Sequence, residues 1–481
     1  MVQIKSIGIT AKKDENMSDW YEQVCLKSEL VEFSTVKGCM VIRPNGYAIW
    51  NKIQKYFEET INKPLQVRNA YFPIFIPESF FKKESDHAKG FSPEVAWIDK
   101  ELTKDGERLA IRPTSETIMY DSYSRWVRSY RDLPLKINQW CNVVRWETKA
   151  TRLFLRSREF LWQEGHNVYE TEKECENETI EIIKKYADLV QNLLAIPVLI
   201  GKKSEKEKFA GAVQTYTIES FMPDGKALQC GTSHNLGQGF AKAFNISYLG
   251  QDEKKHFPYQ NSWGLSTRLI GGLVMTHSDD KGLVLPPKVA ENKVVIIPLL
   301  FKGKEKPITE EAKKLEKELN EFSPILDDRS DYSPGYKFSE YELKGIPLRI
   351  EIGPRDLEKK EVTLVRRDNH KKIALKRKNL KKEIKKLLEI MQEEMLEKAK
   401  KKVNSSIVEV KNFEDFKKAI ENKKLVKMNW CGETTCEEKI KEKTGASTRC
   451  TPLEDINKKV TGTCPHCGKK AKEIMYFSKS Y

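Results

Sequence analysis

Long hydrophobic runs are missing from this chain of 481 residues. No stretch approaches the roughly 18 consecutive apolar residues that a membrane-spanning helix needs, and no apolar secretion signal opens the sequence. The 10 cysteines do not suggest a disulfide framework, which belongs mainly to small secreted domains. The sequence therefore argues against a membrane protein and against a secreted scaffold, and we expect a cytoplasmic protein with no membrane partner.

Glycine-rich phosphate signatures are missing from the second half of the chain. Residues 287–400 contain neither GxGxxG nor GxxxxGK followed by Ser or Thr. These motifs supply the tight turn and backbone approach that dinucleotide folds and P-loops need. We therefore expect neither kind of nucleotide site in that region.

Charge and aromatic residues are abundant. Charged residues make up 32% of the chain, aromatic residues 10%, and the formal net charge is +15. The length suggests about three domains. A basic excess suits a polyanionic partner such as RNA, although a lysine-rich proteome would give the same value.

The most informative stretch is WCNVVRWETKATRLFLRSREFLWQEGH at 140–166. Its pattern predicts a buried strand over 141–144, a basic loop over 149–152 and a second strand over 153–162. An arginine at the end of a buried strand is costly unless it is paired or meets an anion. Two interpretations of Arg145 stay open on the residues alone: an ion pair with Glu147, or a phosphate-binding role.

Flanking segments carry further candidates. Helical periodicity predicts a helix over 47–61, and a strand closed by proline follows at 69–77. The stretch 109–116 runs a strand into the start of a helix for which Thr114 or Ser115 can be the N-cap, so capping is the plain alternative to a functional role there. His234 lies in a strand that leads to a glycine-rich turn, where a structural role is the plain alternative, and Arg268 opens an apolar helix.

The region after Pro287 has a different pattern of apolar and charged residues. The apolar run at 294–300 is typical of a buried parallel strand, and alternating strands and helices indicate an α/β domain. A lysine-dense helix is expected over 379–402. Its charge fits a solvated helix face as well as an RNA contact.

The end of the chain contains two close cysteine pairs. Four residues separate Cys431 from Cys436, and two separate Cys464 from Cys467. Four thiolates satisfy tetrahedral Zn²⁺ and leave no open position, so the pattern favours a structural zinc site over a catalytic one. Cys450 and His466 are spare donors, which leaves the ligand set open, and free reduced thiols are the alternative.

Several segments together resemble the prolyl-tRNA synthetases, class II aminoacyl-tRNA synthetases of the archaeal and eukaryotic-cytosolic type. They are MVIRPNGYAIW at 40–50, NAYFPIFIP at 69–77, GFSPEVAW at 90–97, IRPTSETIMY at 111–120, the 140–166 stretch, CGTSHNLGQ at 230–238 and NSWGLSTRLIG at 261–271. Each motif is weak by itself, but their order and spacing are specific. The closest rival, a threonine-specific class II enzyme, would place a cysteine–histidine–histidine zinc set in the catalytic pocket, and we find none there.

The resemblance implies three domains. Residues 1–286 would form an α+β catalytic domain of the class II synthetase fold, an antiparallel sheet flanked by helices. Residues 287–400 would form an α/β anticodon-binding domain, and residues 401–481 a small zinc-binding α+β domain. The segment 47–77 resembles the first class II signature, which forms the subunit interface, so a homodimer is expected.

The implied activity is that of a proline–tRNA ligase. Such an enzyme activates L-proline with ATP and Mg²⁺ to prolyl-adenylate, releases pyrophosphate, and transfers prolyl to the 3′ end of tRNA(Pro) with release of AMP. The stretch between His166 and Asn261 has no room for the large editing insertion of many bacterial relatives, so no cis-editing is expected.

The resemblance also assigns site residues. Arg145 and Arg268 are the catalytic arginines. Proline binding is carried over to Thr114, Glu116, Arg145, Trp162, Glu164, Phe209 and His234. ATP binding is carried over to Arg145, Glu147, Arg156, Ser157, Gln229, Thr232, Ser266 and Arg268. Ser157 and Ser266 stand where threonine is common in the family, and we expect little change because the hydroxyl remains.

Three further sets follow from the family match. Anticodon contacts are carried over to Phe338, Glu342, Arg349, Arg355, Asp356 and Lys371. The zinc ligands become Cys431, Cys436, Cys464 and Cys467, with Cys450 outside the set. Phe91 and Glu94 resemble the loop that closes over proline.

Overall fold

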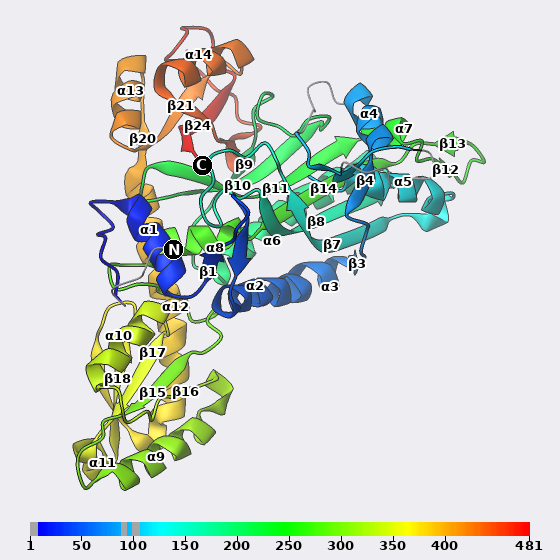
Figure 1. Ribbon diagram of the computed structural model, residues 1–481. Coiled ribbons are helices and arrows are strands. Elements are labelled where there is room, and N and C mark those ends of the chain that lie inside the picture. The colour runs from blue at the N-terminus through cyan, green and yellow to red at the C-terminus, as the bar shows by residue number, and fades with distance from the viewer. Residues whose placement is uncertain (1–7, 88–93, 99–105) are drawn as a thin grey trace.

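The computed structural model describes residues 8–87, 94–98 and 106–481. Phe91, expected in the closing loop, lies outside these residues. Figure 1 shows three parts: an N-terminal domain built on a large sheet, a middle domain, and a small C-terminal module. Helix α12 (Leu380–Ser406) runs from the middle domain to the C-terminal module.

The centre of the N-terminal domain is an antiparallel sheet. Its main strands are β7 (Leu135–Val144), β8 (Glu159–Tyr169), β14 (Tyr259–Ser266) and β11 (Lys226–Gly237), paired in the order β7-β8-β14-β11. β10 (Gln214–Phe221) pairs with β11, and β9 (Leu199–Lys202) pairs with β10. The expected antiparallel sheet flanked by helices is confirmed.

Helix α6 (Glu172–Asn192) covers one face of this sheet. It begins with a capping box in which Thr171 and Glu174 satisfy each other's backbone N–H groups. Apolar residues at helical spacing, including Ile182, Ile183 and Tyr186, are fully buried against the sheet. The residues that alternate outward on β8 and β14 are therefore free to line the opposite face.

Two predicted strands differ in the structure. The second strand of the 140–166 stretch begins at Glu159, not at residue 153. Residues 153–158 form a compact loop instead, because Arg152 and Arg156 exchange backbone hydrogen bonds and Phe154 has a left-handed φ of 57°. The segment 69–77 is split into β3 (Arg68–Asn69) and β4 (Phe75–Pro77), with Pro73 between them, which has no N–H to donate to a ladder.

The helix expected over 47–61 is α2 (Pro44–Phe57), which starts three residues earlier with a proline in its first turn. A π-helical turn (Glu58–Asn62) continues it. The strand and helix start expected within 109–116 are β6 (Leu109–Ile111) and α5 (Glu116–Trp126). The apolar helix opened by Arg268 is α8 (Arg268–His277).

The middle domain has a mixed five-stranded sheet. The expected buried parallel strand is β15 (Val294–Pro298), which pairs in parallel with β16 (Ile325–Leu326) and β17 (Leu348–Ile352). β18 (Glu361–Arg366) and β19 (Lys372–Lys376) complete the sheet in antiparallel orientation. Helices α9 (Glu305–Glu318), α10 (Pro334–Lys344), α11 (Pro354–Lys359) and α12 flank it, and α12 corresponds to the helix expected over 379–402.

The C-terminal module is joined to the large sheet. Its strands β20 (Ile407–Glu409), β21 (Leu425–Trp430) and β24 (Glu473–Ser480) extend the sheet, because β24 pairs in parallel with β11. β23 (Thr451–Pro452) also pairs with β9. Helices α13 (Phe413–Glu421) and α14 (Thr434–Thr444) cover it. The domain limits at 286 and 400 remain predictions, and α12 crosses residue 400 without a break.

In the part of the chain that the structure describes, no helix combines the length and apolar character needed to cross a membrane.

Candidate functional site

A cavity of about 230 Å³ lies on the face of the large sheet that α6 leaves uncovered. Side chains alternate along a strand, so residues two apart share a face. Trp162, Glu164 and His166 of β8 therefore line the cavity together, opposite Ser262 and Ser266 of β14. Gly264 lies between Glu164 and Thr232 in the cross-strand register. Because glycine has no side chain, this position adds no side-chain atoms to the cavity.

Most of the sequence-predicted substrate residues line this one cavity. They are Thr114, Glu116, Arg145, Trp162, Glu164, Phe209, Gln229, Thr232, His234, Ser266 and Arg268. The loops and helices around the sheet supply the rest of the wall, since Thr114 and Glu116 open α5 and Arg268 opens α8. Residues more than 150 positions apart in the sequence thus meet at one site.

Arg145 projects into the cavity without a carboxylate partner. Its guanidinium lies 5.5 Å from the ring centre of Trp162 and 5.4 Å from that of Phe160. Among the described residues, no acidic oxygen comes within the 4.0 Å of an ion pair, so the ion pair with Glu147 is not formed. Burial lowers the pKa of Arg145, and Glu147 only partly offsets this. A cation in this position is suited to an incoming anion.

Arg268 faces the same cavity from the first turn of α8. Its side chain donates to the carbonyl oxygens of Leu155 (3.1 Å) and Gln229 (3.3 Å). Burial and the nearby charge of Arg145 lower its pKa. Two guanidinium groups that repel each other beside a helix N-terminus form a site suited to a polyphosphate.

The opposite side of the cavity is acidic. Glu164 accepts hydrogen bonds from the Ser115 hydroxyl, from Gln139 (3.0 Å) and from the His166 ring (3.1 Å). Burial alone would raise the pKa of Glu164, but these donors lower it. Glu116 accepts from the Thr114 hydroxyl, and burial raises the pKa of Glu116.

This arrangement separates two roles in the Thr114–Glu116 segment. Ser115 occupies the N-cap position of α5, but its side chain makes no capping bond and is turned to Glu164 instead. Glu116 lies beside Glu164 in the cavity wall and accepts from Thr114. Ligand oxygens of Glu116 and Glu164 and a nitrogen of His166 lie within 4.8 Å of one another, a cluster small enough for one ammonium group.

Aromatic rings close the cavity at one end. The rings of Phe209 and His234 lie 4.7 Å apart, and the Thr215 hydroxyl lies 3.0 Å from the Nδ1 atom of His234. Burial lowers the pKa of His234 to about 3, and the nearby His166 and Lys203 add to the effect. His234 is therefore neutral near pH 7 and serves as an uncharged ring in the wall.

Three predicted ATP residues lie elsewhere in the structure. Arg156 and Ser157 line a neighbouring cavity of about 180 Å³ together with Arg152, and Glu147 is exposed. The Ser157 hydroxyl is buried and has no hydrogen-bond partner among the residues that the structure describes. Their assignment to the nucleotide site remains a prediction.

Sequence reasoning missed other residues of the cavity wall. Phe160 lies two positions from Trp162, and Ser262 lies four positions from Ser266, each pair on one strand, so strand alternation could have found them. Glu207 and Thr215 also line the cavity. Glu207 lies in an irregular segment between β9 and β10, where no periodic pattern marks it.

Part of the predicted anticodon set gathers on the middle domain. The Arg349 guanidinium lies 4.0 Å from the ring centre of Phe338 and 3.0 Å from a carboxylate oxygen of Glu342. Asp356 accepts from the backbone N–H of Gly353 (2.8 Å) and caps α11. Arg355 and Lys371 are exposed.

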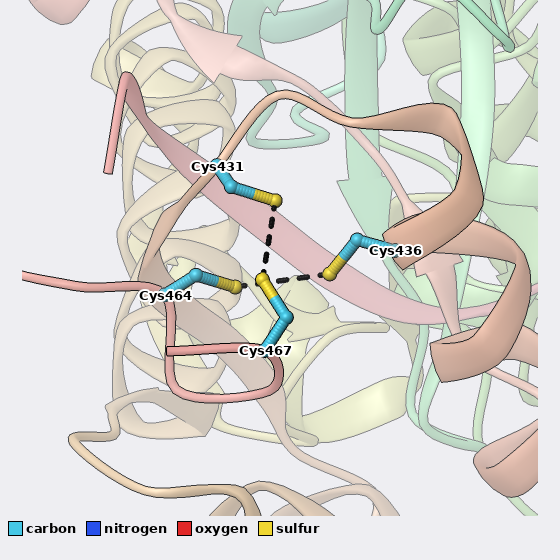
Figure 2. Close-up of side chains that lie close together, drawn as sticks. All are labelled: Cys431, Cys436, Cys464 and Cys467. Carbon is cyan, nitrogen blue, oxygen red and sulfur yellow. Dashed lines mark hydrogen bonds between the residues drawn. The ribbon is translucent and has the colours of Figure 1, made fainter. Parts of the chain in front are cut away.

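The four predicted zinc ligands converge in the C-terminal module. Figure 2 shows the sulfur atoms of Cys431, Cys436, Cys464 and Cys467 pointing toward one another. The Sγ atoms of Cys436 and Cys464 are 3.8 Å apart, and those of Cys431 and Cys467 are 3.6 Å apart. The Nδ1 atom of His466 lies 3.1 Å from the Sγ atom of Cys436.

Three protein-family models match the chain. Residues 97–277 match the tRNA synthetase class II core domain (G, H, P, S and T). Residues 293–387 match the anticodon binding domain, and residues 413–481 match the prolyl-tRNA synthetase C-terminal domain.

Full-length relatives give the same result. The chain is 50% identical over 483 residues to the proline–tRNA ligase of Lachnoclostridium phytofermentans, covering 99% of each chain. It is 50% identical over 469 residues to that of Alkaliphilus oremlandii, covering 97% of this chain and 96% of the relative. A crystal structure of prolyl-tRNA synthetase from Cryptosporidium parvum, complexed with L-proline and AMP, has a TM-score of 0.92 at 45% identity and covers 99% of this chain and 97% of that one.

Proposed function

This chain belongs to the proline–tRNA ligase family of ATP-dependent class II aminoacyl-tRNA synthetases, and we propose that its proline and ATP react in the cavity around Arg145. Its substrates are proline and tRNA(Pro). The observation that carries the proposal is the guanidinium of Arg145, which faces the cavity with no carboxylate partner among the described residues.

Proline is proposed to lie between the acidic and aromatic walls. Its ammonium would meet Glu116 and Thr114 near Glu164, and its carboxylate would meet Arg145. Its ring would pack against Trp162, Phe209 and the neutral His234. Small apolar ligands need such a close-fitting pocket with a few polar contacts that fix their orientation.

ATP is proposed to occupy the arginine side. Arg145 would bind the α-phosphate and Arg268 the γ-phosphate, with Gln229, Thr232 and Ser266 beside the nucleotide. Glu147, Arg156 and Ser157 would join them from the loop after β7. Mg²⁺ would accompany ATP and neutralise phosphate charge.

The reaction needs no side-chain nucleophile. The proline carboxylate attacks the α-phosphate and displaces pyrophosphate, which gives prolyl-adenylate. The terminal ribose hydroxyl of tRNA(Pro) then attacks the activated carbonyl and displaces AMP. Arg145 would hold both reacting groups, the carboxylate and the phosphate, in contact. Catalysis would therefore come from orientation and from stabilisation of developing charge.

The four-cysteine cluster is proposed to hold a structural Zn²⁺. Tetrahedral zinc with Zn–S bonds of about 2.3 Å places its sulfur ligands about 3.8 Å apart, close to the separations of 3.8 and 3.6 Å found here. Four sulfur ligands leave no open position for chemistry. The ion would join two loops that are distant in the sequence.

The remaining proposals concern partners and location. Anticodon bases would stack on Phe338 and meet the charged groups of Arg349 and Glu342, with Arg355, Asp356 and Lys371 beside them. A homodimer is supported by exposed rings around the first class II signature, including Tyr71 (72% exposed) and Phe33 (58% exposed). We also propose that the enzyme acts in the cytoplasm.

The test is ATP–pyrophosphate exchange with each amino acid, for the wild type and for Arg145→Ala. Proline should drive exchange in the wild type, and Arg145→Ala should reduce it at least about 100-fold, because an interaction with developing charge is lost. Arg125→Ala is the matched control, since that arginine is exposed on α5 and pairs with Asp121. Wild-type activity in Arg145→Ala would refute the proposed site.

A further inference from the structure

A short segment of the N-terminal domain, residues 203–209, forms the part of the cavity wall that carries Glu207 and Phe209. It leaves the end of β9 and turns back before β10. The backbone N–H of Phe209 donates to the Thr215 hydroxyl (3.0 Å), which also contacts His234. The position of this wall segment thus sets the aromatic end of the cavity.

The C-terminal module holds the wall segment through one buried glutamate. Glu437 is 1% exposed and lies in α14, directly after Cys436. Its carboxylate accepts from the hydroxyls of Ser204 (2.9 Å) and Thr448 (2.6 Å). The hydroxyl oxygens of Ser204 and Thr448 also lie 3.0 Å from each other. All three residues are buried, so this contact is shielded from water.

A second, partly buried contact supports the same segment. Arg449 of the C-terminal module lies 3.6 Å from Glu207 and 3.8 Å from Glu219 of β10. Glu219 in turn pairs with Lys203 at 2.6 Å, and both of these side chains are 2% exposed. The two cations balance the two carboxylates, which makes the burial of these charges tolerable.

Each end of the wall segment is therefore anchored to the C-terminal module. Ser204 is bound near its start, and Glu207 near its end. Inside the segment, the N–H of Glu207 donates to the Ser204 hydroxyl (3.2 Å). A displacement of Ser204 would consequently move Glu207, and Phe209 two residues later.

We propose that Glu437 and Arg449 are positioning residues that hold Phe209 in place against proline. The four-cysteine loop fixes the start of α14, so the C-terminal module acts on substrate affinity without touching the substrate. This inference rests on the proposed proline site. Misplacement of a binding group by about 1 Å can cost up to 100-fold, and we expect a smaller effect because Phe209 keeps its bond to Thr215.

The test compares Glu437→Ala with Glu438→Ala in proline-dependent pyrophosphate exchange. Glu438 is the next residue of α14 and reaches the same segment through an exposed pair with Lys206. Glu437→Ala should raise the KM for proline about 5- to 20-fold, whereas Glu438→Ala should not change it. The KM for ATP should stay constant in both variants, because Arg145 and Arg268 belong to other elements.

Further variants separate positioning from loss of fold. Glu437→Gln should keep the KM for proline near the wild-type value, since one hydroxyl can still donate to the amide oxygen and the other can turn to accept from the amide N–H. Partial unfolding would lower kcat for every substrate without a selective change in the KM for proline. An unchanged KM for proline in both Glu437→Ala and Arg449→Met would overturn the inference.

The variant Phe209→Ala distinguishes failure of this inference from failure of the proposed function. If Phe209→Ala raises the KM for proline and Glu437→Ala does not, only the positioning role fails. If neither variant changes it, the proposed proline site is wrong.

Discussion

Both terminal nitrogens of the Arg367 guanidinium donate to the carboxylate of Asp279, each at 2.7 Å. Arg367 belongs to the middle domain and is 3% exposed, whereas Asp279 follows α8, the helix that Arg268 opens. Arg367 also donates to the carbonyl oxygen of Glu342 (2.7 Å). This buried arginine thus helps to join the proposed anticodon surface to the N-terminal domain.

Loss of this contact should weaken tRNA use and spare proline activation. A tRNA that must touch both domains gains affinity from their fixed spacing, so Asp279→Ala should raise the KM for tRNA about tenfold. Pyrophosphate exchange without tRNA should stay near the wild-type rate. Glu321→Ala, which removes an exposed pair with Lys381, is the control. The reversed pair Asp279→Arg with Arg367→Asp should recover part of the loss, and equal loss in exchange and charging would contradict this role.

The charge of Glu116 should matter for proline and not for ATP. Glu116→Gln keeps the shape and the contact with Thr114 but removes the charge that faces the proposed ammonium. Since hydrogen bonds to charged groups contribute about 1.5–3 kcal/mol, the KM for proline should rise about 10- to 100-fold. Exchange kinetics with each substrate varied in turn measure this. Glu181→Gln, an exposed change on α6, should have no effect, and a larger rise in the KM for ATP than for proline would place Glu116 in the nucleotide site.

Alanine should enter the cavity and be activated. A pocket built for proline rejects a smaller amino acid only by the apolar contacts that are lost, about 1–3 kcal/mol per missing methylene. Alanine-dependent pyrophosphate exchange should therefore be measurable at high alanine concentration, and purified alanyl-tRNA(Pro) should not be hydrolysed by the enzyme. Exchange at background level, or rapid hydrolysis of the mischarged tRNA, would contradict these two expectations.

Zinc content should follow the four clustered cysteines. Purified protein should contain about one Zn²⁺ per chain, and Cys436→Ser should lose most of it together with thermal stability, because structural zinc contributes directly to folding. Cys450→Ser is the control. Cys450 is buried beside Gly201, outside the cluster. Elemental analysis measures the zinc content per chain, and an equal zinc content in Cys436→Ser and the wild type would rule out the site.

Stability should depend on pH through His277. Burial lowers the pKa of His277 to about 4, and its ring contacts the carbonyl oxygen of Leu194 at 2.9 Å. An unfolded histidine has a pKa near 6.5, so between about pH 6.5 and 4 the unfolded state binds the extra proton. The wild type therefore loses stability as the pH falls through this window, by at most about 1.4 kcal/mol per pH unit for one histidine.

The variant His277→Gln lacks this loss. It should be less stable than the wild type at pH 7.5, and the difference between their thermal midpoints should shrink at pH 5. Calorimetry at both pH values measures the two differences. A constant difference for His277→Gln would show that burial does not hold His277 neutral.

The cavity was largely predictable because its residues sit in strongly patterned elements. Trp162 and Glu164 share a strand face, and Arg268 begins an apolar helix, so family motifs fall on regular positions. The start of β8 was not predictable, because the apolar residues of the 153–155 turn are buried and imitate a strand. Their burial comes from packing in the N-terminal domain, which no local pattern contains.

The support of the cavity was harder to predict than the cavity itself. Ser204 and Glu437 are more than 230 positions apart, and neither lies in a motif. A glutamate that follows a cysteine in a helix is expected to be exposed, but in the fold Ser204 and Thr448 both donate to the buried Glu437. The spacing of these residues in the sequence does not predict such a contact unless the fold is known.

The parallel pairing of β24 with β11 also bears on how this chain is made. Synthesis proceeds from the N-terminus, so Lys226 and Ala227 of β11 leave the ribosome long before their partners Lys479 and Ser480 exist. Until then, this edge of the large sheet offers unpaired backbone groups to other chains. One edge of β11 therefore stays unpaired until β24 has been synthesised. A premature stop within β24 would leave this edge unpaired and yield a product prone to aggregation.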